Sequence, residues 1–415
     1  MAEILSITGM GAAGDGIARL PDGGTCFVPL ALPGETVRAT MQGNRASLEA
    51  VLSASPDRVT PPCPHFSECG ACALQHWADA PYAAWKSAKL SEALSRAGYA
   101  DVTLAPMVRT PLRHRRRADL ALRRTPAGLA LGFHARGSQQ VVALETCEIL
   151  DPRLVALFAP LREVLRRVNA LQKEGSAVLN LLDSGPDLLL RTDGPLDQHG
   201  RTALAQFAQA HGLPRIAWAR GNAPPELAAQ LGSVHITLSG ARVQPAPGAF
   251  LQASPAGEAG IIAAVLAALP KKLGPKARIA ELYAGIGTLS FPLSQHARVS
   301  AYEASPEAVQ ALKAAAGSHR IQAECRDLDR RPLLPLDLKV FQVVVLDPPF
   351  TGAAEQVAQL ARARVPCVIY VSCNPAALGR DAAVLRQAGY RLAAATPIDQ
   401  FPFSPHLEAV VAFTQ

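Results

Sequence analysis

The chain has 415 residues, of which 49% are hydrophobic and 18% charged, and its formal net charge is +7. This length predicts two or three domains with a sizeable core, and no apolar run approaches the length of a membrane span. The excess of basic residues is compatible with a nucleic-acid partner. Eight irregularly spaced cysteines, without an export signal, predict a cytoplasmic protein whose reduced thiols have metal-binding or catalytic roles.

Residues 1–54 are predicted to form a small β domain. Runs typical of strands at 26–30, 35–39 and 47–52 alternate with turns rich in glycine and proline. Many short strands with such turns predict a barrel or a sandwich. A five-stranded barrel of this size is a frequent nucleic-acid-binding module, so we expect this domain to contact nucleic acid.

Three closely spaced cysteines follow this domain. Cys63, Cys69 and Cys72 form a C-x5-C-x2-C pattern, and Gly70 allows the loop between them to close tightly. A tetrahedral metal ion or a cubane cluster needs a fourth ligand, for which Cys147, after a strand-like run, is the best candidate. Thiolate ligands suit zinc as well as an iron–sulfur cluster, and the spacing alone leaves both open.

The next segment contains a predicted helix and the most basic stretch of the chain. Apolar residues at helical spacing predict a helix over 77–97. Arg113, Arg115 and Arg117 precede a predicted turn at 125–128, and on a strand they would share one face. Three guanidinium groups on one face suit RNA phosphates, although the same charges are also typical of a solvated edge strand.

From about residue 255 helical and strand-like segments alternate, which predicts a parallel sheet covered by helices. A helix over 257–269 leads to a strand at 277–282 and then to Gly285 in a Gly-x-Gly turn. The glycine pattern is too short for a dinucleotide site, which argues against NAD. Glu303 ends the next strand, where a carboxylate accepts hydrogen bonds from ribose hydroxyls.

Further strand-like segments complete a predicted doubly wound sheet. A short strand near 321–323 precedes Asp327, and a buried strand over 341–346 ends in Asp347 within an Asp-Pro-Pro-Phe motif. This order of strand-end acids predicts a site for a nucleotide-like methyl donor. The remaining strands are expected at 368–371, 390–395 and 408–413.

Cys373 follows the predicted strand at 368–371, and Asn374 and Pro375 end that strand. In an open α/β sheet this position faces the crevice in which ligands bind. A cysteine there is either a small buried hydrophobic residue or a nucleophile. The acidic and glycine-rich ends of the other strands in the same sheet favour the nucleophile.

Together these motifs resemble the RNA uracil-5-methyltransferases, which use S-adenosylmethionine, over nearly the whole chain. The resemblance implies a multidomain α/β protein. A TRAM-like, OB-like RNA-binding β-barrel would occupy 1–54, and a central α+β domain with an iron–sulfur cluster and an RNA-binding surface would occupy 55–250. A doubly wound, Rossmann-like methyltransferase domain would occupy 251–415. The motifs concerned are Phe27-Val28-Pro29, Leu32-Pro33-Gly34-Glu35, the four cysteines, Ser372-Cys373-Asn374-Pro375 and His406-Leu407-Glu408-Ala409-Val410-Val411.

Carried over motif by motif, the resemblance assigns the site residues. Cys373 would be the nucleophile and Glu408 the general base. A [4Fe–4S] cluster, rather than zinc, would be held by Cys63, Cys69, Cys72 and Cys147. The S-adenosylmethionine site would include Gln252, Tyr283, Gly285, Glu303, Asp327 and Asp347.

The two predicted catalytic residues fit methylation of a carbon atom. Uracil C5 becomes reactive only when a thiolate adds to C6, and a base must then remove the C5 proton. Transfer to an exocyclic amine would need neither Cys373 nor Glu408. Because a stacked base hides its C5–C6 edge, the target uridine must be flipped or unpaired.

Three positions depart from the family's usual residues, namely Phe350 in place of arginine and Ser254 and Thr288 in place of asparagine. Asp-Pro-Pro-Phe also resembles the motif of amino-group methyltransferases acting on adenine or cytosine, which is the alternative enzyme class. A non-catalytic RNA-binding scaffold is a third reading. The resemblance favours 23S rRNA as the substrate, with tRNA as the alternative, and a monomeric protein.

Overall fold

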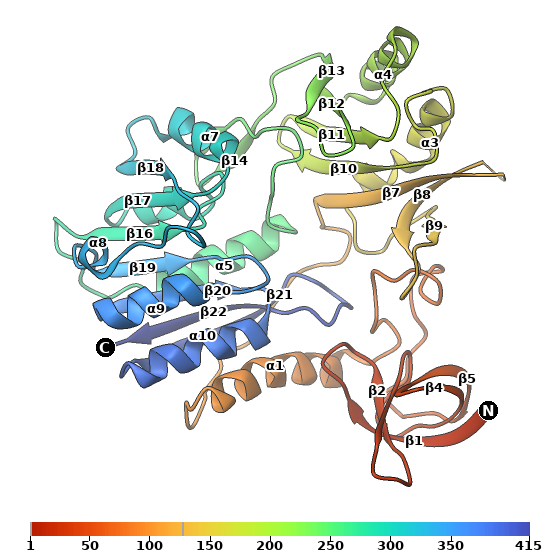
Figure 1. Ribbon diagram of the computed structural model, residues 1–415, viewed down its shortest axis with the longest axis horizontal. Helices are drawn as coiled ribbons and strands as arrows, with labels where there is room; N and C mark the ends of the chain where they lie inside the picture. The colour runs from red at the N-terminus through yellow and green to blue at the C-terminus, as the bar shows by residue number, and fades with distance from the viewer. Residues whose placement is uncertain (1, 127) are drawn as a thin grey trace.

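Five strands form a closed barrel at the start of the computed structural model, which describes residues 2–126 and 128–415 (Figure 1). The alternating pattern of β1 turns Leu5 and Ile7 inward, where they pack with Val37 and Ala39 of the neighbouring β4. The predicted barrel is thereby confirmed. In barrel order its strands are β1 (Ala2–Met10), β2 (Gly16–Arg19), β3 (Thr25–Val28), β5 (Arg45–Ser53) and β4 (Thr36–Gln42).

A seven-stranded sheet forms the central part of the chain and runs in the order β13-β12-β11-β10-β7-β8-β9. Three helices, α2, α3 and α4, pack on one face of this sheet over a core of leucines. The strands are β7 (Arg117–Thr125), β8 (Gly128–His134), β9 (Val141–Ala143), β10 (Glu174–Leu182), β11 (Gly185–Thr192), β12 (Arg215–Arg220) and β13 (Glu226–Gln230). The helices are α2 (Pro152–Val155), α3 (Phe158–Arg166) and α4 (Gln198–His211).

The prediction that three arginines share one strand is wrong. Strand β7 begins only at Arg117, and Arg113 has a left-handed backbone conformation (φ 59°) that no strand accommodates. Arg113 instead forms an ion pair with Glu148, with 2.7 Å between Nη2 and Oε2. The predicted turn at 125–128 lies between β7 and β8, although its residue Ala127 lies outside the described residues.

The C-terminal sheet has eight strands in the order β18-β17-β16-β19-β20-β22-β21-β6. The first five are parallel, and β22 runs antiparallel to its neighbours β20 and β21. The predicted doubly wound sheet is confirmed, with its reversal of strand order between β16 and β19. The strands are β16 (Arg278–Leu282), β17 (Arg298–Glu303), β18 (Ile321–Cys325), β19 (Val343–Leu346), β20 (Cys367–Ser372), β21 (Arg391–Asp399), β22 (Glu408–Thr414) and β6 (Val108–Arg109).

Helices cover both faces of this sheet because alternate strand residues point to opposite sides. One face packs on α5 (Pro255–Ala267), α6 (Ser290–Ser294) and α7 (Pro306–Ala316), and the other on α9 (Ala354–Ala363) and α10 (Pro375–Gln387). The short helix α8 (Pro335–Leu338) packs on α9, and a hairpin of β14 (Ile236–Leu238) and β15 (Ala241–Val243) lies beside α7. Among the described residues, no helix is long and apolar enough to cross a membrane.

Helix α1 (Asp79–Arg96) matches the helix predicted at 77–97 but joins the C-terminal sheet. Leu90 and Leu94 are fully buried in the same core as Leu378 and Leu385 of α10, and Figure 1 shows the two helices lying side by side. Strand β6 adds the eighth strand of the sheet. The division expected at 55–250 therefore differs from the structure here, because a segment within that range completes the fold of 251–415.

Candidate active site

A cavity of about 990 Å³ lies between the central sheet and the carboxyl ends of the C-terminal sheet. Its position beside the ends of β16 and β19 is where open α/β sheets bind ligands. Every residue predicted to bind the methyl donor or to act in catalysis lines this one cavity. These residues are Gln252, Tyr283, Gly285, Glu303, Asp327, Asp347, Cys373 and Glu408.

Cys373 stands between the last residue of β20 and the first turn of α10. Asn374 caps the helix, because its Oδ1 accepts a hydrogen bond from the Ala376 amide at 3.1 Å, and Pro375 occupies the first helical position. Burial raises the pKa of the Cys373 thiol to about 12, and the nearby carboxylates of Glu408 and Asp347 add to the shift. The amino end of α10 acts in the opposite direction, because it favours a thiolate.

Cys373 and Glu408 lie next to each other at adjoining ends of the neighbouring strands β20 and β22. In the antiparallel pair of β20 and β22, Ser372 is opposite Ala409, so the next position along each strand brings Cys373 to Glu408. Glu408 is only 3% exposed. Two residues 35 positions apart in sequence thus share one wall of the cavity.

Glutamine side chains connect two buried carboxylates at the floor of the cavity. Gln400 Nε2 donates to Glu408 Oε2 at 2.6 Å and to Gln252 Oε1 at 3.0 Å, and Gln252 Nε2 donates to Asp347 Oδ2 at 3.1 Å. Burial raises the pKa of both carboxyl groups, and the charge of Asp347 adds to the effect on Glu408. The hydrogen bonds from the two amides act in the opposite direction.

The glycine turn after β16 leaves open space on the cavity side. Gly285 has a φ of 56°, and a side chain there would meet no atom, so a ligand can approach its backbone. Position 287 requires glycine for a different reason: a Cβ there would lie only 2.6 Å from the Leu312 side chain and 2.8 Å from the Phe291 side chain. Tyr283, which precedes the turn, also has a positive φ of 62°.

Two of the acids predicted to bind the methyl donor, Glu303 for its ribose and Asp327, lie at or just after the ends of β17 and β18. Glu303 accepts hydrogen bonds from the backbone amides of Gly285 at 2.9 Å and Ser305 at 2.8 Å. These bonds fix the carboxylate beside the glycine turn, while each oxygen retains a free lone pair. Asp327 is held by the amides of Asp329 and Arg330 at 3.1 and 3.2 Å.

Two of the departures from the family's residues have structural explanations. Ser254 caps α5, because its Oγ accepts a hydrogen bond from the Gly257 amide at 3.0 Å. Phe350 is 54% exposed at the mouth of the cavity, and its ring packs edge-on against His406 at 5.8 Å between centroids. Asn374 holds this loop in place by donating from Nδ2 to the Phe350 carbonyl at 2.9 Å.

The wall opposite the methyltransferase strands is cationic and aromatic. Arg115, Arg117 and Arg191 line the cavity from the central part of the chain. The guanidinium of Arg115 lies 5.8 Å from the ring centroid of Phe401, and that of Arg117 lies 5.9 Å from the ring of Phe250. This surface presents positive charge and flat rings to whatever enters the cavity.

Arg191, Glu281 and Gln400 are among the lining residues that the sequence analysis missed. Glu281 lies within the buried strand β16 and accepts a hydrogen bond from the hydroxyl of Ser290, and burial raises its pKa to about 8. A charged residue inside an apolar strand was the available signal for Glu281. Gln400 has no comparable signal, because it directly follows β21 and precedes an irregular Phe-Pro-Phe segment.

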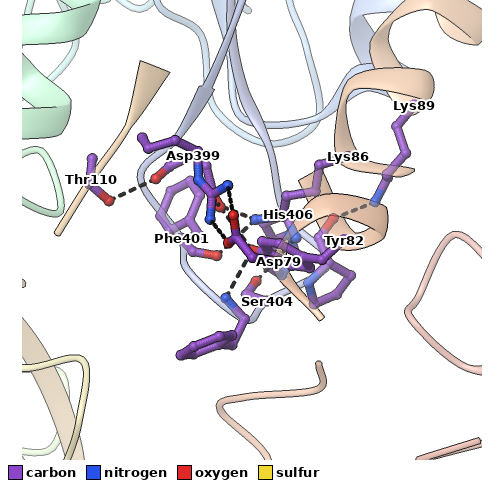
Figure 2. A network of polar contacts seen from close by, with 12 residues as sticks. Asp79, Tyr82, Lys86, Lys89, Thr110, Asp399, Phe401, Ser404 and His406 are labelled. Carbon is purple, nitrogen blue, oxygen red and sulfur yellow. Dashed lines mark hydrogen bonds and ion pairs between the residues drawn. The ribbon is translucent and has the colours of Figure 1, made fainter. Parts of the chain in front are cut away.

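A buried ion pair between Lys86 and Asp399 anchors the loop that carries Phe401, as Figure 2 shows. Lys86 of α1 is 0% exposed and Asp399 is 1% exposed, with 2.5 Å between Nζ and Oδ1. Tyr82 donates from its hydroxyl to Asp399 Oδ2 at 2.9 Å, and Thr110 donates to the Asp399 carbonyl at 2.7 Å. Helix α1 thereby fixes the residue that directly precedes Gln400.

The four predicted metal-binding cysteines lie outside this cavity, near the end of β8. The Gly70 amide donates to the His134 carbonyl at 2.9 Å, and a Cβ on Gly70 would come within 2.8 Å of the same carbonyl oxygen, so only glycine fits this approach. Burial raises the pKa of Cys72 to about 12, and repulsion from Cys147, Cys69 and Cys63 adds to it. Among the residues that the structure describes, no group of three or more His, Cys, Asp or Glu side chains forms a site for a metal ion.

The cysteine segment is attached directly to the loop at the cavity. The backbone amides of Ala73 and Leu74, which follow Cys72, both donate to the Phe403 carbonyl at 2.8 and 3.0 Å. These bonds hold the turn that follows Phe401.

Comparison with known proteins gives consistent results along the chain. A family model described as tRNA (uracil-5-)-methyltransferase matches residues 247–415. An uncharacterized RNA methyltransferase of Caulobacter vibrioides is 40% identical over 426 residues, covering 99% of both chains. The 23S rRNA (uracil(1939)-C(5))-methyltransferase RlmD of Halomonas elongata is 36% identical, over 98% of this chain and 88% of its own.

A second RlmD and a solved structure extend the comparison. The 23S rRNA (uracil(1939)-C(5))-methyltransferase RlmD of Chromohalobacter salexigens is 33% identical, over 100% of this chain and 90% of its own. The crystal structure of the Pyrococcus abyssi tRNA (uracil-54, C5)-methyltransferase with S-adenosyl-L-homocysteine has a TM-score of 0.74 over 100% of both chains. At 20% identity this structure supports the fold alone.

Proposed function

Because the chain belongs to the family of RNA uracil-5-methyltransferases, we propose that it transfers a methyl group from S-adenosylmethionine to C5 of a uridine in RNA. The observation that carries the proposal is the neighbouring pair of Cys373 and Glu408 at one wall of the cavity. Carbon methylation needs both a nucleophile and a base, whereas transfer to an amine needs neither.

The cavity suits a cationic methyl donor. Glu281, Asp347 and Glu408 are buried carboxyl groups whose pKa values are raised, so each favours a nearby positive charge. S-Adenosylmethionine has a sulfonium and an ammonium group and supplies an electrophilic methyl group when bound. Glu303, held against the glycine turn, would accept hydrogen bonds from the ribose hydroxyls.

In the proposed reaction, the Cys373 thiol gives its proton to water, and its sulfur forms a bond to C6 of the uracil. The electron pair of the C5–C6 double bond moves toward C5, which would attack the methyl carbon of S-adenosylmethionine. The bond between that carbon and the sulfonium sulfur would break, and S-adenosylhomocysteine would leave. Glu408 removes the remaining proton from C5. The electrons of that C–H bond restore the C5–C6 double bond, and the Cys373 sulfur leaves as a thiolate.

The RNA would reach this site through the arginine-lined wall. Arg115, Arg117 and Arg191 would contact phosphates, and the exposed Phe350 would stack on a base that leaves its neighbours. The names of the two RlmD relatives favour 23S rRNA as the substrate, and tRNA is the second candidate. We propose that the N-terminal barrel is a TRAM-like domain that binds the surrounding RNA.

We also propose that Cys63, Cys69, Cys72 and Cys147 hold a [4Fe–4S] cluster. The support is chemical, because the set contains only thiols and their charges interact with one another. A cubane binds each thiolate through a different iron atom and so accepts a wider spacing of sulfurs than one tetrahedral ion does. The cluster would order the segment that supports Phe403.

The activity is tested with two variants. Cys373→Ala should neither methylate RNA nor form a covalent complex. Glu408→Gln should transfer the methyl group but release the product ~10²–10⁴-fold more slowly, so that a labelled protein–RNA species survives denaturing electrophoresis. Methylation by Cys373→Ala would refute the thiol mechanism and favour the amino-group class. Mass spectrometry of rRNA and tRNA from a strain without this protein would identify the substrate.

A further inference from the structure

Gln400 connects the two halves of the cavity, and the proposed reaction leaves it without a role. It is 3% exposed, and its amide nitrogen donates one hydrogen to Glu408 Oε2 and the other to Gln252 Oε1. Because Gln252 donates in turn to Asp347, the chain of amides begins and ends at a carboxylate. An ionised carboxylate only accepts hydrogen bonds, so this arrangement fixes the direction of every bond in the chain.

The geometry distinguishes the two oxygens of Glu408. Oε2 is occupied by Gln400, whereas Oε1 is buried and has no hydrogen-bond partner among the described residues. An unpaired buried carboxylate oxygen is energetically unfavourable unless a ligand supplies the missing partner. Glu408 also lines the cavity beside Cys373.

The position of Gln400 is fixed from several sides. Asp399, directly before it, is held by Lys86 and Tyr82 of α1. Helix α5 packs closely against Gln400, because a Cβ on Gly257 would lie 2.7 Å from the Gln400 Cβ. A side chain held in this way at both ends is preorganised to orient its partner.

We propose that Gln400 is a positioning residue for the proton-transfer step: by holding Oε2 of Glu408, it leaves Oε1 as the oxygen that accepts the C5 proton. Through Gln252 the same bonds tie the orientation of the base to Asp347 in the donor site. The inference rests on the proposed function, since it gives a role to a residue within that reaction. The proton moves from C5 to Oε1 as the C6–S bond breaks.

The pH dependence of product release reports this role. The titratable groups that face Glu408 are Asp347 and Cys373, while Glu258 of α5, a helix that packs on β22, is paired with Arg116 at 2.5 Å. The Gln400 hydrogen bond lowers the pKa of Glu408 against the effect of burial. Removing the bond should therefore raise that pKa, so that the base is ionised only at higher pH.

The experiment uses the full-length protein with Gln400→Met, which retains the length of the side chain but removes the amide. Product release from the methylated covalent complex should slow ~10–100-fold at neutral pH and recover as the pH rises. In a plot of the release rate against pH, the rising limb should lie at a pH higher by about one unit or more than in the wild type. Formation of the complex should change much less than its release. Gln356→Met is the matched control, because Gln356 is equally buried but bonds only to the Leu333 backbone.

Two outcomes would overturn the proposal. In the first, Gln400→Met releases product at an unchanged rate and with an unchanged pH profile. In the second, the rate of product release falls by the same factor at every pH. Gln400→Leu is a second variant if Gln400→Met fails to fold. Failure of the proposed function looks different, because then the wild-type protein would form no covalent complex and Cys373→Ala would still methylate.

Discussion

The ion pair between Lys86 and Asp399 allows a quantitative test of how the active-site loop is held. In Lys86→Met, Asp399 stays buried and keeps only the Tyr82 hydroxyl at 2.9 Å and the more distant Arg109, whose Nε lies 3.8 Å away. Removing one partner of a buried ion pair costs ~3–5 kcal/mol, because the other charge remains without compensation. Lys86 also donates to the Phe401 carbonyl at 2.9 Å, and that bond is lost as well.

We expect Lys86→Met to lower the free energy of unfolding of the C-terminal sheet by about 3–5 kcal/mol, a large share of the ~5–15 kcal/mol of a typical domain. Chemical denaturation followed by far-UV circular dichroism measures this change. The control is Arg123→Met, which removes the exposed pair with Glu174 and should cost at most ~1 kcal/mol. If Lys86→Met cost no more than the control, water would have to reach Asp399, and the buried pair would not anchor the loop.

Three further predictions concern the donor site and the cysteines. Glu303→Ala should weaken S-adenosylmethionine binding about 10- to 100-fold, measured by calorimetry, with RNA affinity unchanged; equal cofactor affinity would mean that the ribose is held elsewhere. The raised pKa of buried Glu281 means that its ionisation destabilises the fold as pH rises from about 4.5 toward 8, so Glu281→Gln should gain stability relative to wild type with increasing pH. A stability difference that does not vary with pH would contradict this account. Anaerobically purified protein should contain four iron atoms, and Cys147→Ser should lose them; stoichiometric zinc would refute the cluster.

Much of the methyltransferase sheet could be predicted because its signals are local. The apolar run before Cys373, and the turn residues Asn374 and Pro375 after it, determine where β20 ends and α10 begins. In a parallel sheet, all strand ends of one direction meet at one edge, so the predicted site residues come together without further information.

The features that were missed depend on contacts between distant parts of the chain. Nothing near α1 in the sequence specifies that Leu90 and Leu94 pack on α10, because an apolar helix face fits more than one sheet. The strand predicted through Arg113 failed because the backbone of this segment pairs with a distant one: the Arg113 amide donates to the Glu148 carbonyl and the Arg115 amide to the Ile149 carbonyl, both at 3.0 Å. The role proposed for Gln400 depends on its hydrogen bonds to Gln252 and Glu408, and only the three-dimensional structure shows that these residues meet.

The packing of α1 on the C-terminal sheet has a consequence for how this protein is made. The ribosome completes α1 long before α10, and at about 5–20 residues per second the ~290 residues between Leu90 and Leu378 take roughly 15–60 s to synthesise. During that interval the apolar face of α1 has no final partner, although the barrel beside it is already complete. The apolar face of α1 is therefore exposed to aggregation while the rest of the chain is synthesised. A fragment beginning at residue 251 would lack α1 and β6, which complete its sheet.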